Sequence, residues 1–120
     1  MRLTGSAVGA LVVAALLASG LPAAASSPSE EIAHLLDFIA ASPCVFIRNS
    51  VAYDGVEAAA HVKDKYDYYR RDIHSAEDFI AQAASRSAIS GQPYLVRCDA
   101  DTLPAADWLA RELAIFRGQP

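Results

Sequence analysis

The stretch CVFIRNS, residues 44–50, decides how this chain folds. Its first four residues are apolar and partly β-branched, which predicts a short buried strand, and Arg48-Asn49-Ser50 predicts a turn after it. A second strand is predicted at residues 94–98, YLVRC, which ends at Cys98. A disulfide from Cys44 to Cys98 would bring the two strands together, because the Cα atoms of a disulfide lie roughly 6 Å apart.

The N-terminal residues are typical of a cleavable signal peptide. Arg2 supplies a positive charge, residues 7–18 form an uncharged apolar run, and three alanines follow at residues 23–25. The run is shorter than the roughly 20 apolar residues that span a bilayer. We therefore predict a signal peptide at residues 1–25, one globular domain at residues 26–120, and a periplasmic or secreted protein without stable membrane insertion.

The cysteine content agrees with export. The chain has 2 cysteines, and an even pair in a small exported domain is typical of a structural disulfide. Closing the loop from Cys44 to Cys98 is expected to stabilise the fold by roughly 4 kcal/mol. A redox role has less support, since the sequence has no C-x-x-C motif.

Four helices are predicted around the two strands. Capping boxes begin at Ser27 and Asp54, a similar signal begins at Ser75, and a last helix begins at Pro104. The prediction is an α+β fold in the order α-β-α-α-β-α, with four helices packed on a small two-stranded ribbon and one disulfide. The last helix is expected to turn these apolar side chains inward: Trp108, Leu109, Leu113, Ile115 and Phe116.

Four motifs, in this order, resemble the exported proteobacterial family DUF5329, a domain of unknown function. They lie at residues 42–50, 57–65, 75–80 and 85–94. The family pattern has glycine and serine where this chain has Ser50 and Ala88. Either the turn does not need a positive φ at residue 50, or Ser50 is strained there. The resemblance implies an exported domain and no particular activity.

The most suggestive candidate site begins at Arg48 and Asn49. A guanidinium just past a buried strand, followed by a turn amide, could bind a carboxylate or phosphate. The alternative is structural: Arg48 pairs with an acidic residue, and Asn49 shapes the turn. His61 and Lys65 extend the candidate binding patch, whose partner would be a periplasmic protein or a small anion.

A second hypothesis is a small hydrolase-like enzyme. Glu57, His61 and Lys65 recur every four residues on one predicted helix face, which could orient the histidine as a general base. Its nucleophile would be Ser87 or Ser90. No G-x-S-x-G motif surrounds these serines, so we assign no catalytic residue and favour a non-enzymatic binding or interaction module.

Metal and nucleic-acid binding have little support. The histidines His34, His61 and His74 show no metal-ligand spacing, so no metal or other cofactor is predicted. The net charge of −4, from 10 basic and 14 acidic residues, does not favour a nucleic-acid partner.

Overall fold

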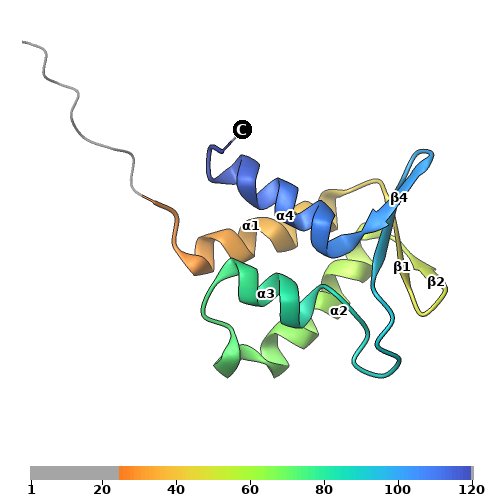
Figure 1. Ribbon diagram of the computed structural model, residues 1–120, viewed down its shortest axis with the longest axis horizontal. Helices are drawn as coiled ribbons and strands as arrows, with labels where there is room; N and C mark the ends of the chain where they lie inside the picture. The colour runs from red at the N-terminus through yellow and green to blue at the C-terminus, as the bar shows by residue number, and fades with distance from the viewer. Residues whose placement is uncertain (1–24, 120) are drawn as a thin grey trace, which may run out of the picture.

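The computed structural model describes residues 25–119 and shows four α-helices on one side of a four-stranded antiparallel sheet (Figure 1). The α+β class is therefore confirmed. The predicted signal peptide lies, apart from Ala25, outside the described residues, so its cleavage stays a prediction. None of the helices in residues 25–119 is long and apolar enough to cross a membrane.

The helices begin where the capping signals predict. The Ser27 side chain accepts a hydrogen bond from the Glu30 backbone N–H, and the Ser27 backbone N–H donates to the Glu30 carboxylate. Asp54 and Glu57 repeat this capping box. Ser75 caps the third helix. The helices are α1 (Pro28–Ala41), α2 (Gly55–Tyr68), α3 (Ala76–Ala83) and α4 (Ala105–Phe116), with a short 3₁₀ turn, η2 (Arg70–Asp72), between α2 and α3.

The two predicted strands pair with each other, but the sheet has four strands instead of two, because each predicted strand is followed by a hairpin turn and a second, shorter strand. The strands are β1 (Val45–Arg48), β2 (Val51–Tyr53), β3 (Leu95–Cys98) and β4 (Asp101–Pro104), in the spatial order β2-β1-β3-β4. The added strands β2 and β4 are short, largely exposed and at the sheet edges, so the apolar pattern of a buried strand is missing from them. Pro104 is both the last residue of β4 and the N-cap of α4, and a proline at the end of an edge strand is tolerated.

The register places one row of apolar side chains against the helices. Phe46 of β1 pairs with Tyr53 of β2 and with Val96 of β3, which in turn pairs with Leu103 of β4. Phe46 and Val96 are buried in the core together with side chains from all four α-helices. Arg48 lies two residues after Phe46, and therefore on the same face of the sheet.

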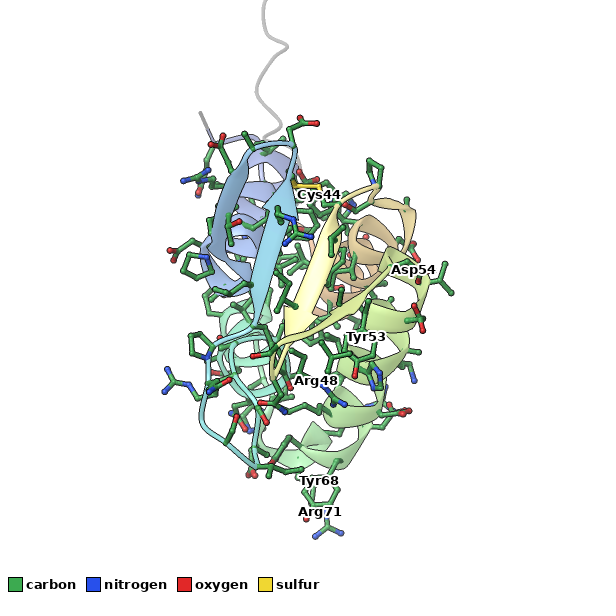
Figure 2. All side chains as sticks on the ribbon, turned by 90° about the vertical axis from the view of Figure 1, so that its right-hand side faces the viewer. Cys44, Arg48, Tyr53, Asp54, Tyr68 and Arg71 are labelled. Carbon is green, nitrogen blue, oxygen red and sulfur yellow. A yellow bond between two sulfur atoms is a disulfide. The ribbon has the colours of Figure 1, made fainter. Side chains whose placement is uncertain are left out.

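The predicted disulfide is confirmed. Cys44, just before β1, is bonded to Cys98, the last residue of β3, and the two Cα atoms are 4.7 Å apart. Figure 2 shows Cys44 at one end of β1 and Arg48 at the other. The two central strands are thus joined covalently at the end away from Arg48.

The turn between β1 and β2 requires positive φ at both of its residues. Asn49 has φ 52° and Ser50 has φ 67°, and Arg48 pairs with Val51 across the turn. Two central residues with φ > 0 are the mark of the tight hairpin turns that favour glycine. Of the two interpretations given for residue 50, the structure supports the second: Ser50 adopts a positive φ and is strained there.

The last turn of α4 departs from the prediction. Leu109 and Leu113 are buried, whereas Ile115 is 66% exposed and Phe116 is 39% exposed. Ile115 follows Leu113 by only two residues, which turns its side chain to the opposite side of the helix. Phe116 stacks on the ring of His34 at the domain surface, with 4.0 Å between the ring centroids.

Candidate functional site

A surface hollow of about 400 Å³ lies where the β1–β2 turn, the end of α2 and the loop before β3 meet. Figure 2 shows Arg48 and Tyr68 at this end of the molecule. Two cations, one carboxylate and several aromatic or aliphatic side chains line it, among them Arg48, Lys65, Asp64, Tyr68, Tyr69, Ile89 and Tyr94. The candidate residues Arg48 and Lys65, which are 17 positions apart in the sequence, therefore share one hollow.

Arg48 is the unusual group of this hollow. Its side chain is half-buried, and its guanidinium lies 5.5 Å from the centre of the Tyr53 ring. The Nε–H is buried without a hydrogen-bond partner, and within residues 25–119 no carboxylate forms an ion pair with Arg48. The predicted structural alternative, pairing of Arg48 with an acidic residue, is thus not observed. The Nη groups of Arg48, unlike its Nε, are not among the buried polar atoms, so the guanidinium has donors that an added anion can reach.

Asn49 has a structural role, but it differs from the predicted shaping of its own turn, because its side chain bonds to a distant loop. Its Nδ2 donates to Ser87 Oγ at 3.2 Å, and its Oδ1 accepts a hydrogen bond from the Ser90 hydroxyl. The amide is engaged in both directions. Asn49 therefore ties the β1–β2 turn to the loop that forms the facing wall of the hollow.

Lys65 holds the same loop from the side of α2. Its Nζ donates to the Arg86 carbonyl at 2.6 Å and to the Tyr94 hydroxyl at 3.1 Å, and lies 5.0 Å from the centre of the Tyr94 ring. Its charge faces the hollow, while its proton donors are largely used within the protein. Lys65 thus holds one wall of the hollow in place and adds a positive charge near it.

His61 lies behind the hollow, against Tyr53. The two rings are 4.9 Å apart at 75°, so Tyr53 contacts the imidazole as well as the Arg48 guanidinium. His61 does not line the hollow; with Arg48 and Tyr53 it lines a separate, mostly apolar cavity of about 40 Å³ between the sheet and the helices. A space of that volume holds about one water molecule.

The predicted alignment of Glu57 with His61 does not form a hydrogen bond in the described part of the chain. The Glu57 carboxylate instead accepts a hydrogen bond from the Asp54 amide in the capping box, at 3.2 Å. The arrangement therefore lacks the carboxylate-oriented histidine that a general base would use.

The serine loop is organised around Ser87, which is 5% exposed. Besides the Asn49 amide, its Oγ accepts hydrogen bonds from the backbone N–H groups of Ile89 and Ser90 at 3.2 and 3.3 Å. Ser90 accepts a bond from the Gln92 amide, and Ser85 donates to the Ile80 carbonyl. These contacts shape the loop, and no hydrogen bond between His61 and a serine occurs in residues 25–119.

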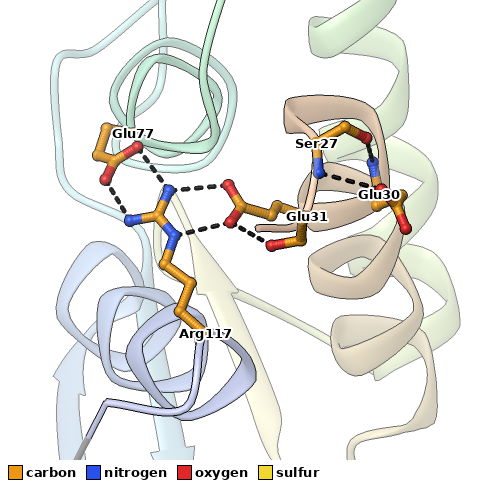
Figure 3. A network of polar contacts seen from close by, with 6 residues as sticks. Ser27, Glu30, Glu31, Glu77 and Arg117 are labelled. Atoms are coloured by element: carbon orange, nitrogen blue, oxygen red, sulfur yellow. Dashed lines mark hydrogen bonds and ion pairs between the residues drawn. The ribbon is translucent and has the colours of Figure 1, made fainter. Parts of the chain in front are cut away.

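A second arginine, Arg117, lies at the opposite end of the domain and is fully paired (Figure 3). Its Nε and Nη2 donate to the two oxygens of Glu31 at 2.7 and 2.8 Å, and its Nη1 and Nη2 donate to Glu77 at 2.6 and 3.0 Å. Ser26 adds a hydrogen bond of 2.7 Å to Glu31. The hydrogen bonds from Arg117 lower the pKa of the buried Glu31 to about 2. This cluster joins α1, α3 and the end of α4.

The remaining polar groups offer no metal centre: residues 25–119 contain no cluster of three or more histidine, cysteine, aspartate or glutamate side chains suited to a metal ion.

Sequence reasoning missed the apolar walls of the hollow. Tyr68 is 82% exposed and Ile89 is 95% exposed, and they come from the end of α2 and from the loop. Tyr68 lies away from the face of α2 that buries Ala58 and Val62, and an aromatic side chain at such a position was a usable signal. Ile89 carries no such signal, because an isolated apolar residue in a polar loop is common.

Comparison with known proteins gives a family and one relative. The family of unknown function DUF5329 matches residues 26–117. The chain is 38% identical over 87 residues to "Uncharacterized protein YfeK" of Salmonella typhimurium, an alignment that covers 69% of this chain and 71% of that protein. No solved structure matches the chain.

Proposed function

This chain belongs to the DUF5329 family, and on that premise we propose that it is a non-enzymatic binding module that holds an anionic group on Arg48. The observation that carries the proposal is the half-buried guanidinium that has no acidic partner within residues 25–119 and a buried Nε–H without an acceptor. An anion in the hollow would accept hydrogen bonds from the Nη groups of this guanidinium and neutralise its charge. Hydrogen bonds to charged groups are the stronger ones, and arginine forms them with two oxygens at once.

The other candidate residues support Arg48 in this proposal. Lys65 and Asn49 fix the loop that faces the guanidinium, through Tyr94 and Ser87 respectively. His61 packs behind Tyr53, the ring on which the guanidinium lies. Arg48 is thus the residue that contacts the ligand, and Asn49, His61 and Lys65 position it or its surroundings.

The hydrolase alternative has less support. Ser87 is buried and accepts three hydrogen bonds that shape its own loop, and the rings of His61 and Tyr53 are packed together. A catalytic pair requires a histidine within hydrogen-bond reach of the nucleophile. A periplasmic or secreted location is part of the proposal, and it is supported by the disulfide, since such bonds persist in oxidising compartments.

The Nε–H group of Arg48 allows a direct test by NMR. In the purified, oxidised protein we would titrate sodium acetate and sodium phosphate against sodium chloride at constant ionic strength. We expect the Arg48 Nε–H resonance, assigned by its loss in Arg48→Met, to move with acetate or phosphate and not with chloride. Arg97, which is exposed on β3, is the matched control, and its resonance should stay in place. An Arg48 resonance that ignores both anions would overturn the proposal.

A further inference from the structure

We propose that the ligand of the hollow is a carboxylate carried by an apolar group, such as an aromatic acid or the last residue of a peptide. This inference rests on the proposed function, because it assumes that Arg48 holds the anion. It adds which anion is held and what that anion is attached to.

The charges around the hollow favour a single negative charge. Its lining contains two cations, Arg48 and Lys65, and one anion, Asp64, which leaves a net charge of plus one. The Lys65 ammonium already donates to a backbone carbonyl and to the Tyr94 hydroxyl. A phosphate dianion would therefore meet one unpaired guanidinium and a repelling carboxylate. A carboxylate matches both the charge and the planar fork of arginine.

The apolar walls favour a ligand with a large apolar part. Ile89 is 95% exposed and Tyr68 is 82% exposed, and both line the same hollow as Arg48. They come from two separate elements, so an apolar group that enters beside the carboxylate can be covered from two sides. Covering about 60 Å² of apolar surface corresponds to roughly a tenfold gain in affinity.

The size of the hollow sets an upper limit on the ligand part that it encloses. Its volume of about 400 Å³ lies at the lower end of the range of roughly 300–1,000 Å³ found for small-molecule sites. One aromatic or branched aliphatic side chain with its carboxylate fits such a volume. Free aryl or alkyl acids and peptide C-termini share this chemistry, and the experiment has to tell them apart.

The test compares four probes by calorimetry and by the Arg48 Nε–H resonance: acetate, phenyl phosphate, N-acetylphenylalanine and N-acetylphenylalaninamide. We expect N-acetylphenylalanine to bind about tenfold more tightly than acetate and more tightly than phenyl phosphate. The amide, which lacks the carboxylate, should not bind. A tripeptide that ends in phenylalanine separates the sources: tighter binding than N-acetylphenylalanine identifies a peptide end, and equal or weaker binding identifies a free acid.

Two exposed isoleucines provide matched variants. Ile89→Ser should reduce the affinity for N-acetylphenylalanine toward that for acetate and leave acetate binding unchanged. Ile115→Ser removes another exposed isoleucine side chain from α4, which does not line the hollow, and should change neither affinity. Unfolding midpoints of both variants, expected to match the parent protein, check that the fold is intact.

The two proposals fail in different ways. If acetate moves the Arg48 resonance but N-acetylphenylalanine binds no more tightly, the ligand class is wrong and the anion site stands. If phenyl phosphate binds more tightly than N-acetylphenylalanine, the charge argument is wrong. If none of these anions moves the resonance, the anion site itself is refuted.

Discussion

Arg117 and Arg48 both have partly buried side chains and lie at opposite ends of one small domain, and they differ in almost every contact. Arg117 donates four hydrogen bonds to two carboxylates, one of which, Glu31, is buried. Arg48 makes no ion pair within residues 25–119 and leaves its buried Nε–H without an acceptor. A guanidinium paired inside the chain joins helices. A guanidinium left unpaired stabilises little by itself and can bind a group from outside.

The largest expected effect comes from removing the paired arginine. Arg117→Met should lower the free energy of unfolding by about 2–3 kcal/mol, because Glu31 stays buried without its charge partner. Urea unfolding at pH 7 measures this. Arg111→Met, an exposed position on the same helix, is the control and should change stability by less than about 0.5 kcal/mol. A loss of stability for Arg117→Met as small as that of the control would show that the pairing of Arg117 with Glu31 and Glu77 does not stabilise the fold.

A smaller effect should appear when the partner is neutralised, and it should depend on pH. Hydrogen bonds from Arg117 lower the pKa of Glu31 from 4.5 to about 2. A carboxylate with a lowered pKa stabilises the fold above about pH 4.5, and this contribution is lost as the pH falls toward 2. Glu31→Gln should therefore cost about 1–2 kcal/mol at pH 7.

Unfolding measured from pH 7 to pH 2 completes this test. The parent protein should lose stability through the window below pH 4.5, and Glu31→Gln should show a shallower decline over the same range. Glu77, whose pKa is also lowered by hydrogen bonds from Arg117, remains in the variant and accounts for part of the residual slope. Identical slopes in the two proteins would show that Glu31 is not the responsible group.

The two ends also differ in what the sequence could predict. The caps at Ser27, Asp54 and Ser75 follow from local patterns of four residues, and the disulfide follows from there being only two cysteines. The pairing of Arg117 with Glu31 joins residues 86 positions apart, and no local pattern marks either of them as a partner.

The edge strands and the hollow could not be predicted from the sequence for a related reason. β2 and β4 are three and four residues long and mostly exposed, so they owe their existence to pairing with β1 and β3 rather than to an apolar pattern. Arg48 and Lys65 could be proposed together from the sequence. The hydrogen bonds of Asn49 and Lys65 to the facing loop could not be predicted, because they depend on tertiary contacts.

A third and smaller effect is expected in the turn beside Arg48. Ser50 adopts φ 67°, which glycine tolerates more readily than serine. Ser50→Gly should therefore raise the free energy of unfolding by about 0.5–1 kcal/mol. Asn49→Gly, at the neighbouring positive φ, should have the opposite sign, because it removes the hydrogen bonds to Ser87 and Ser90. Chemical unfolding of the two variants measures this, and a loss of stability for Ser50→Gly would show that the positive φ is not the larger effect at residue 50.

The smallest expected effect bears most directly on the comparison. Arg48→Met keeps an unbranched side chain over Tyr53 and removes a buried donor that has no acceptor, while it gives up a cation–π contact worth roughly 0.5 kcal/mol. The two contributions oppose each other, so without added anion the stability should change by less than about 0.5 kcal/mol. Unfolding of Arg48→Met beside Arg117→Met measures the contrast directly. A loss of about 2–3 kcal/mol at Arg48 would mean that this arginine also holds the fold together, whereas unchanged stability with lost anion response would separate binding from folding.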